Sequence, residues 1–474
     1  MNRTTLTGAA LLAIFAGLAQ AATITVGPNL TDFDHITITA AIAAAATSGD
    51  EIVVEPDLYP ENLVITGKTL TIRKSATAGE VQIFGQGLGS VVALSASNVT
   101  LDGLTIFGGA AEVGAGVFSP NDSTVIVAGC IIEDNDASGG SETGGGIYCS
   151  KSLTMRNSII RNNTSTGNGG GVDLRGVGPH VIEDCLIESN HAGPSDVSPD
   201  AGGGLSVNTT SAVQVTRTDF IGNTAGWRGG AVAVLANTIN FDRCTFGDNA
   251  SPRGAAIWIS DGDTVRIQNS VFDSNTADAF GGAVYNEQLF EAVNCTFAGN
   301  TDSSTNNTFE GVRSDSQTSL LNCIVVNPSA GSHGGIGIYT TRYSVVPEAP
   351  TGTPDANGNF DADPMFVDAA NGDYRLMAGS PAIDAGDSLG KPATSGASTS
   401  VLTLLEDYDA NVRNLDDASV PNTGIPAWEL NIDLGAFEFQ PATVASCIAD
   451  ADGNGVLNVD DIDTFVQSFL AGCP

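Results

Sequence analysis

The chain has 474 residues, and its 18 Lys and Arg against 54 Asp and Glu give a formal net charge of −36. This excess of negative charge repels phosphate groups, so it argues against nucleic acid as a partner. It is compatible with binding of cations or neutral glycans, and equally with acidity that only keeps an exported protein soluble. The length leaves room for two or three domains.

The first 21 residues have the features of a secretory signal peptide. Arg3 supplies a positive charge, residues 9–18 form an apolar run, and Ala19-Gln20-Ala21 ends in the small residues that precede cleavage. No later stretch is apolar over the length that a membrane span requires. We therefore expect an exported protein, secreted or held at the cell surface.

An alanine-rich apolar run from Ile38 to Ala46 precedes Ser48-Gly49-Asp50. This pattern predicts a short helix. Because the residues that follow form a repetitive stack, we expect the helix to cover the open end of its first coil.

A small residue recurs through the middle of the chain at intervals of 25 to 33 residues. An apolar residue lies three positions before it and another two positions after it in nearly every copy. Alternation in short segments predicts strands with one buried face, and the three-residue step predicts a bend between two strands. A period in this range indicates stacked repeats. The small residues are Leu104, Cys130, Ser158, Cys185, Thr218, Cys244, Ser270, Cys295 and Cys323.

Two further features recur in these repeats. An asparagine lies five positions after the small residue, from Asn135 to Asn300, and we expect each to hydrogen-bond to its neighbour one coil away. A glycine pair such as Gly145-Gly146 precedes a third strand. Three short strands in each coil of about 27 residues, without helix signals, predict an all-β, right-handed parallel β-helix of about eleven coils within residues 22–345.

The alternating glycine-pair and Phe-x-x-Asn phrases, the latter clear in Phe246-Gly247-Asp248-Asn249, resemble the repeats of polymorphic outer-membrane proteins. This resemblance implies the pectin-lyase-like β-helix fold over roughly residues 50–345. It says little about function, because one fold hosts many activities.

Most of the eight cysteines are predicted to be reduced. Cys130, Cys185 and Cys244 occupy the same slot in alternate coils, which would place them roughly 9.6 Å apart, beyond the ~7 Å over which a disulfide can form. Cys295 and Cys323 are one coil apart, so pairing remains open for them.

The outward positions of the third strand carry aromatic and charged side chains. Rings can stack on sugars, while arginine and carboxylate groups can hydrogen-bond hydroxyls or uronates. We therefore predict a glycan-binding strip, with loop-covered surface residues as the alternative. Its members are Tyr148, Asp173, Arg175, Arg228, Trp258 and Tyr285.

The sequence gives only weak candidates for catalysis, namely Asp173 and Arg175. A polysaccharide lyase would use an arginine or lysine base, and a glycoside hydrolase would need carboxylates facing one gap. No dense cluster of this kind is evident. Three readings stay open: a glycan- or partner-binding protein, a polysaccharide lyase or hydrolase, and an adhesin or structural protein without a ligand.

Residues 346–441 contain the phrases Gly379-Ser380-Pro381-Ala382-Ile383-Asp384 and Asp433-Leu434-Gly435-Ala436-Phe437-Glu438. These phrases resemble the choice-of-anchor domains that follow secreted β-helices. The resemblance implies a segment that covers the C-terminal end of the solenoid.

Residues 442–474 contain a loop with oxygen ligands at the spacing of an EF-hand, which suits Ca²⁺. Aspartate at the twelfth position resembles the dockerins, although dockerins have two such loops and this chain has one. The resemblance implies a cohesin-like or other surface protein as partner. Cys447 and Cys473 bracket this tail and are expected to form a disulfide that stabilises so short a unit. The expected ligands are Asp450, Asp452, Asn454, the Val456 carbonyl, Asn458 and Asp461.

Overall fold

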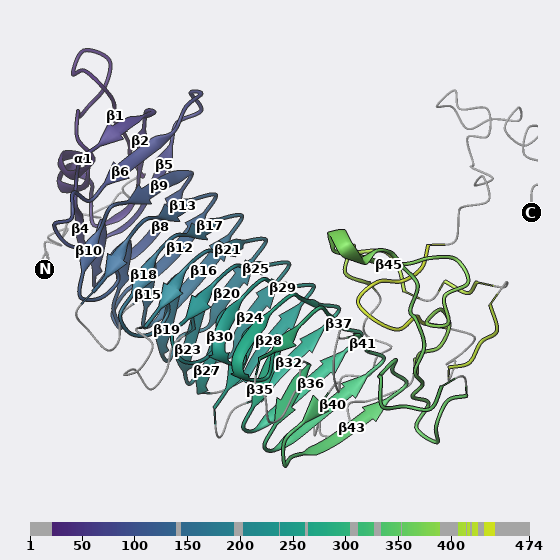
Figure 1. The fold of residues 1–474 in the computed structure, drawn as a ribbon. Helices are drawn as coiled ribbons and strands as arrows, with labels where there is room; N and C mark the ends of the chain where they lie inside the picture. Colours follow the sequence, from purple (N-terminus) through teal and green to yellow (C-terminus); the bar gives the residue numbers. More distant parts are fainter. Residues whose placement is uncertain are drawn as a thin grey trace, which may run out of the picture.

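The computed structural model describes residues 21–138, 144–193, 202–236, 238–260, 264–303, 311–326, 333–351, 353–388, 406–413, 415–417, 420–424 and 431–440. From residue 22 to about 345 the chain winds into one long stack of coils (Figure 1). Three sheets run along the stack, and all strand pairs in them are parallel. Two of these sheets have 11 strands each, so the solenoid makes about ten turns between its first coil and its last.

Sheet A contains the strands that precede the recurring small residue. Its 13 strands are β1 (Thr23–Val26), β2 (Ser48–Val54), β5 (Thr69–Lys74), β8 (Asn98–Asp102), β12 (Thr124–Ala128), β16 (Ser152–Arg156), β20 (His180–Glu183), β24 (Val213–Thr216), β28 (Thr238–Asp242), β32 (Thr264–Gln268), β36 (Leu289–Val293), β40 (Gln317–Leu321) and β43 (Ile338–Arg342).

Sheet B contains the strands that follow the small residue. Its 11 strands are β3 (Asp57–Tyr59), β6 (Val81–Phe84), β9 (Leu104–Phe107), β13 (Ile131–Glu133), β17 (Ile159–Arg161), β21 (Leu186–Glu188), β25 (Asp219–Ile221), β29 (Thr245–Gly247), β33 (Val271–Asp273), β37 (Thr296–Ala298) and β41 (Ile324–Val326).

Sheet C contains the strands that follow the glycine pairs. Its 11 strands are β4 (Leu63–Thr66), β7 (Val92–Ser95), β11 (Val117–Ser119), β15 (Ile147–Cys149), β19 (Val172–Gly176), β23 (Leu205–Thr209), β27 (Val232–Ala236), β31 (Ile257–Ile259), β35 (Val284–Asn286), β39 (Val312–Ser314) and β42 (His333–Gly334).

A fourth sheet corrects the expectation of three strands in each coil. Sheet D lies between sheets B and C in chain order, and most of its strands are only two residues long, too short to show an alternation in sequence. Its eight strands are β10 (Ala110–Ala111), β14 (Asp136–Ala137), β18 (Thr164–Ser165), β22 (His191–Ala192), β26 (Thr224–Ala225), β30 (Ala250–Arg253), β34 (Thr276–Phe280) and β38 (Thr301–Asp302).

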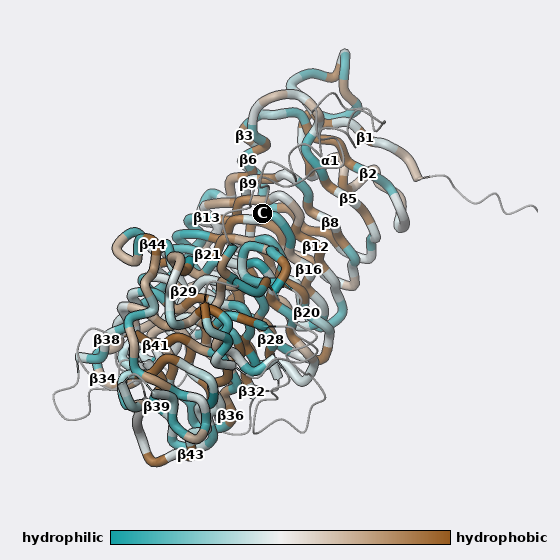
Figure 2. Tube along the Cα trace, turned by 90° about the vertical axis from the view of Figure 1, so that its right-hand side faces the viewer, coloured by the Kyte–Doolittle hydropathy of each residue, from teal (hydrophilic) through white to brown (hydrophobic). Residues whose placement is uncertain are grey.

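Side chains at equivalent positions of successive coils stack on one another in the interior. Apolar stretches recur from coil to coil (Figure 2). Phe220, Phe246, Phe272 and Phe297 form one column, with ring centroids 5.2, 4.8 and 4.5 Å apart. The six described cysteines are buried and free, including Cys295 and Cys323. Burial raises the pKa of Cys130 to about 12. The predicted reduced ladder is therefore present.

The predicted asparagine ladder is also present. Each amide Nδ2 from Asn135 to Asn275 donates to Oδ1 of the asparagine in the next coil, over 2.8 to 3.1 Å. The same Oδ1 accepts from the backbone N–H of the preceding asparagine, as from Asn223 to Asn249. Every rung is fully buried or nearly so, so the ladder satisfies polar groups that water cannot reach.

The bends have the backbone conformations that the sequence pattern requires. The residue before the small residue has a positive φ in each described coil, as at Asn157 (49°) and Asp184 (54°). The glycine pairs lie where backbones approach closely. A Cβ on Gly171 would come within 2.6 Å of the Gly204 carbonyl oxygen, a distance that no side chain tolerates.

The predicted N-terminal helix is α1 (Ile38–Ala44), and Thr37 caps it by accepting a hydrogen bond from Ala40 N–H. Its buried side chains, Ile38, Ala41 and Ile42, join the solenoid core. No helix among the described residues is long and apolar enough to cross a membrane.

The segment after residue 345 lies along the outer side of sheet B near the last coils (Figure 1). It contains an antiparallel pair, β44 (Phe366–Asp368) and β45 (Asp373–Leu376), joined by the 3-10 turn η1 (Ala369–Asn371). Tyr408 Oη lies 2.6 Å from Thr245 Oγ1, and Ala436 N–H donates to Thr296 Oγ1. Among the described residues of this segment, only Val346 and Ala349 join or pack against the main core. The described part of this segment therefore makes a lateral contact with sheet B that the sequence did not predict, and its role as an end cover stays a prediction.

Candidate functional site

Four of the six predicted strip residues lie in one column on sheet C, while Arg175 lies two residues after Asp173 on β19 and Arg228 precedes β27. Strand register aligns Tyr148 with Asp173 and Trp258 with Tyr285 in adjacent coils. The column continues beyond the predicted members to Arg313. The alternation of the sequence therefore places the outward positions correctly. In order, the column is Phe118, Tyr148, Asp173, Ser206, Ala233, Trp258, Tyr285 and Arg313.

Facing outward does not make these side chains accessible. The exposed fraction is 0% for Asp173, 1% for Trp258 and 7% for Tyr285. Arg175 Nε lies 3.0 Å from both carboxylate oxygens of Asp173. A buried, ion-paired carboxylate is poorly placed to act on a polysaccharide, so the geometry does not favour the two weak catalytic candidates. Tyr148 is half-buried and stacks on Phe118 at 5.6 Å.

Three residues of this column, Trp258, Tyr285 and Arg313, belong to a series in which three arginines and four aromatic rings alternate. We call Trp258, Arg228, Trp227, Arg253, Phe280, Arg313 and Tyr285 the arginine–aromatic array. Each guanidinium lies between two rings, and the shortest distances from guanidinium carbon to ring centroid are 4.3 Å for Arg228, 4.4 Å for Arg253 and 4.0 Å for Arg313. Such contacts are attractive and hold the charges in place.

Two rings of the array, Trp258 and Tyr285, are buried and form its inner part. Tyr285 Oη donates to Asp315 Oδ2 at 2.8 Å, and burial raises the pKa of this phenol. Trp227, Arg253 and Phe280 are only partly buried. Arg253 forms no ion pair within the part of the chain that the structure describes. Its charge is thus held between two rings, and no carboxylate among the described residues pairs with it.

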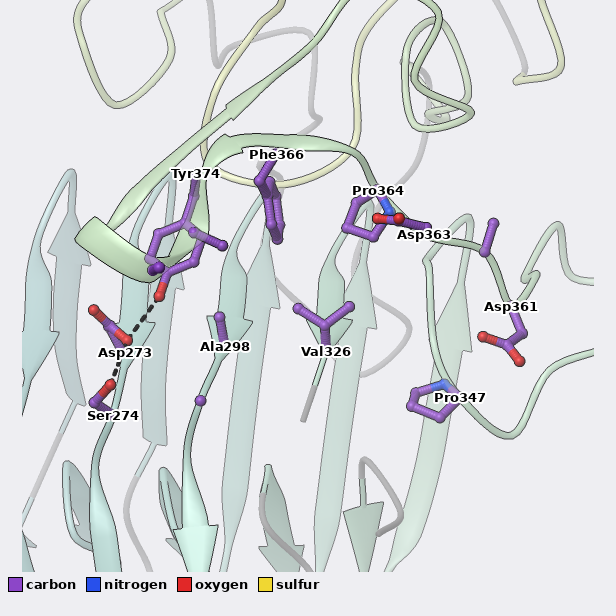
Figure 3. Close-up of a pocket in the computed structure, with 14 residues that line it drawn as sticks. Asp273, Ser274, Ala298, Val326, Pro347, Asp361, Asp363, Pro364, Phe366 and Tyr374 are labelled. Atoms are coloured by element: carbon purple, nitrogen blue, oxygen red, sulfur yellow. Dashed lines mark hydrogen bonds between the residues drawn. The ribbon is translucent and has the colours of Figure 1, made fainter. Parts of the chain in front are cut away.

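A groove lies between the side of the solenoid and the C-terminal segment (Figure 3). We call it the lateral groove, and its volume is about 800 Å³. Asp273, Ala298 and Val326 form one wall, since strand register aligns them in successive coils. Residues 361–374 form the other wall, with Asp361, Asp363, Phe366 and Tyr374 among the lining side chains.

The wall of the lateral groove around Asp273 is well ordered by hydrogen bonds. Asp273 Oδ1 accepts from Tyr374 Oη and from Ser274 Oγ, each at 2.7 Å (Figure 3). The Tyr374 ring meets Phe366 edge to face at 5.1 Å. Among the described residues, Asp273, Asp361 and Asp363 form no ion pair. The groove therefore combines negative charge with aromatic and small apolar surfaces.

The model of the right-handed β-helix region matches residues 63–220 and 168–346, which is more than half of the chain. The chain belongs to the right-handed β-helix family. The match covers the repeats that form the column, the array and the solenoid wall of the lateral groove.

Similar proteins add little about the function of this β-helix protein. It is 29% identical over 189 residues to metabotropic glutamate receptor-like protein R of Dictyostelium discoideum. That match covers 40% of this chain and spans only 11% of the length of that curated relative.

The similar solved structures are also distant. Pectin methylesterase from Aspergillus niger has 14% identity and a TM-score of 0.34, with 61% of this chain and 92% of that chain covered. YbhC from Escherichia coli has 12% identity and a TM-score of 0.24, with coverage of 68% and 75%. These values are too low to carry an argument about activity.

Several predicted features lie outside the described residues. They include the signal peptide up to residue 20, the calcium loop from Asp450 to Asp461, and the pair Cys447 and Cys473. Within the described ranges, no group of three or more His, Cys, Asp or Glu is arranged to hold a metal ion. The Ca²⁺ site in the tail stays a prediction.

Two groups of residues were missed from the predicted site. Arg313 follows Tyr285 by one coil, but its strand lacks the glycine pair that precedes most of the other copies. The lateral groove depends on a nonrepetitive segment folding back on the solenoid, and no periodic signal marks that contact.

Proposed function

We propose that this β-helix protein is an exported carbohydrate-binding protein whose arginine–aromatic array holds a sugar chain. The observation that carries the proposal is the alternation of three guanidinium groups with four rings over consecutive coils. Adjacent coils repeat at about 4.8 Å, comparable to the length of one pyranose unit. Partly exposed rings offer stacking surfaces to sugars, and the arginines offer hydrogen-bond donors to hydroxyls or acidic groups.

Burial of part of the predicted strip changes the role of its members but not the location of the proposed site. Trp258 and Tyr285 support Arg228 and Arg313, while Trp227, Arg253 and Phe280 supply the accessible surface. Rigid support lowers the entropy lost on binding.

Affinity electrophoresis against a panel of neutral and acidic polysaccharides tests this proposal. Trp227→Ala and Arg253→Ala should each weaken binding about five- to thirty-fold, the range expected when a stacking or charge-assisted contact is lost. Arg156→Ala is the matched control, because Arg156 is exposed and lies on sheet A. Equal retardation of all three variants and the parent protein would contradict a glycan site at the array.

The enzyme alternative predicts a different outcome. A lyase would generate new absorbance from uronic-acid polysaccharides, and a hydrolase would generate reducing ends. Activity that survives in Trp227→Ala and Arg253→Ala would place catalysis away from the array. A protein with neither binding nor turnover would match the structural adhesin.

We further propose that the tail binds Ca²⁺ and attaches the β-helix to a cohesin-like or other surface protein. The support is the ligand spacing of Asp450, Asp452, Asn454, Val456, Asn458 and Asp461. Calorimetry should show one Ca²⁺ fewer bound by Asp450→Ala than by the parent. Unchanged uptake would refute the assignment, and thiol counting would test the Cys447–Cys473 disulfide.

A further inference from the structure

The lateral groove has no part in the proposed glycan site, which lies on sheet C. Its volume of about 800 Å³ is within the range of cavities that bind small molecules. Its 14 lining residues include three aspartates and no lysine, arginine or histidine. A hollow lined by charge of one sign concentrates ions of the opposite sign. Its ligand is therefore expected to be a cation.

The distribution of the carboxylates distinguishes a metal ion from a larger cation. Figure 3 shows Asp273 at one end of the lateral groove and Asp361 and Asp363 at the other, with Phe366 and Val326 between them. No three acidic side chains in the described residues converge as metal ligands. A compact divalent ion needs six or more oxygens within about 2.6 Å. The separated charges instead match a ligand whose positive charges are also separated.

The surface between the charged ends is apolar. Ala298, Val326 and Phe366 line it, and small residues of η1 complete it. A methylene chain gains free energy by leaving water to contact such a surface, whereas a chain of sugar hydroxyls would find few hydrogen-bond partners there. We propose that the lateral groove binds a linear diamine or polyamine, with one ammonium group at Asp273 and the other at Asp361 and Asp363.

The carboxylates are available for this role. Asp361 makes no side-chain hydrogen bond with another described residue, so it can accept from an ammonium group. Asp363 accepts one bond, from Met365 N–H, and Asp273 is oriented by Tyr374 and Ser274. Each carboxylate can accept further hydrogen bonds at its remaining lone pairs.

Calorimetry on the full chain, with Ca²⁺ in excess to fill the predicted tail loop, tests the proposal. The probes are 1,5-diaminopentane and spermidine, with pentylamine and 1,5-pentanediol as controls for one charge and for none. The diamine should bind at least about two- to five-fold more tightly than the monoamine, the gain expected from one additional partly exposed ion pair. Equal affinity of diamine and monoamine would overturn the proposal, as would failure of the diamine to bind beside Ca²⁺.

Two variants locate the binding. Asp361→Asn should weaken diamine binding about two- to five-fold. Ala370→Lys places an ammonium group on an exposed lining residue and should prevent binding while thermal unfolding stays unchanged. Asp136→Asn is the matched control, because it removes the same charge from an exposed position on β14, outside the lateral groove. An equal effect of Asp136→Asn would show attraction to the acidic chain as a whole and would overturn the proposal.

Discussion

Replacing Asn249 with alanine should destabilise the solenoid more than any change of a surface asparagine. Its Oδ1 accepts from the N–H and the Nδ2 of Asn223, at 2.9 and 3.1 Å. Its Nδ2 donates to the Phe220 carbonyl at 2.8 Å and to Asn275 Oδ1 at 3.0 Å. The side chain is fully buried, so water cannot replace these four hydrogen bonds.

The expected magnitude follows from the partners that remain. Asn223 Nδ2 keeps its bond to the Ile187 carbonyl, and Asn275 Oδ1 keeps the Asn249 N–H. The N–H of Asn223 loses the acceptor that it has in the native ladder. One orphaned buried donor and the weakened neighbouring bonds should lower the free energy of unfolding by about 2 to 5 kcal/mol.

Urea denaturation followed by tryptophan fluorescence measures this change. The matched control is Asn98→Ala on β8, because this exposed asparagine should contribute no more than about 0.5 kcal/mol. Hydrogen exchange should quicken at the amide of Asn223 and in the coils beside it, since coils of a solenoid contact only their neighbours. Equal denaturation midpoints for the two variants would refute the stabilising role of the ladder.

Three further predictions concern the core and the C-terminal segment. Phe246→Ala should cost about 3 to 5 kcal/mol in urea denaturation, because its ring is fully buried between two stacked neighbours. Cys130 and the other five described cysteines should resist a thiol reagent until the protein is denatured, since burial raises the pKa of Cys130 to about 12; rapid native labelling would contradict this. Burial raises the pKa of Asp384 from 3.8 to about 6, so the folded state binds its proton more tightly than the unfolded state. This contribution is full below pH 4 and lost as the pH rises through 6, so the melting temperature should rise from pH 7 to pH 5, by less in Asp384→Asn.

The solenoid could be predicted because each coil repeats the same physical requirements. The small residue, the asparagine and the glycine pair each satisfy a local need of the backbone, and each recurs. Nine copies of one requirement outweigh ambiguity in any single copy. The fourth sheet escaped prediction because two-residue strands such as Asp136–Ala137 contain one inward side chain and therefore no period.

Accessibility at the candidate site could not be predicted in the same way. Strand alternation distinguishes inward from outward positions, and it did so for Trp258 and Tyr285. It carries no information about loops that pack on the outer face. Arg313 lies one coil from Tyr285 in the same column, whereas Arg228 reaches the Trp258 ring from the residues that precede β27. The direction of each side chain was thus predictable, but its exposure was not.

The contact between the C-terminal segment and sheet B was not predicted, because no repeat marks it. The outward position that Asp273 occupies on sheet B holds Arg161 and Glu188 in earlier coils. There, Arg161 Nη1 lies 3.9 Å from Glu188 Oε1. In later coils the same position holds Ile221 and then Gly247, Asp273, Ala298 and Val326, which are smaller than Arg161 and Glu188. This loss of side-chain volume begins where Tyr408 and Tyr374 pack on sheet B. A change from long charged side chains to shorter ones along one outward column is therefore the sequence signal that we infer for a lateral partner. In this chain the partner is its own C-terminal segment, and the lateral groove lies between that column and residues 361–374.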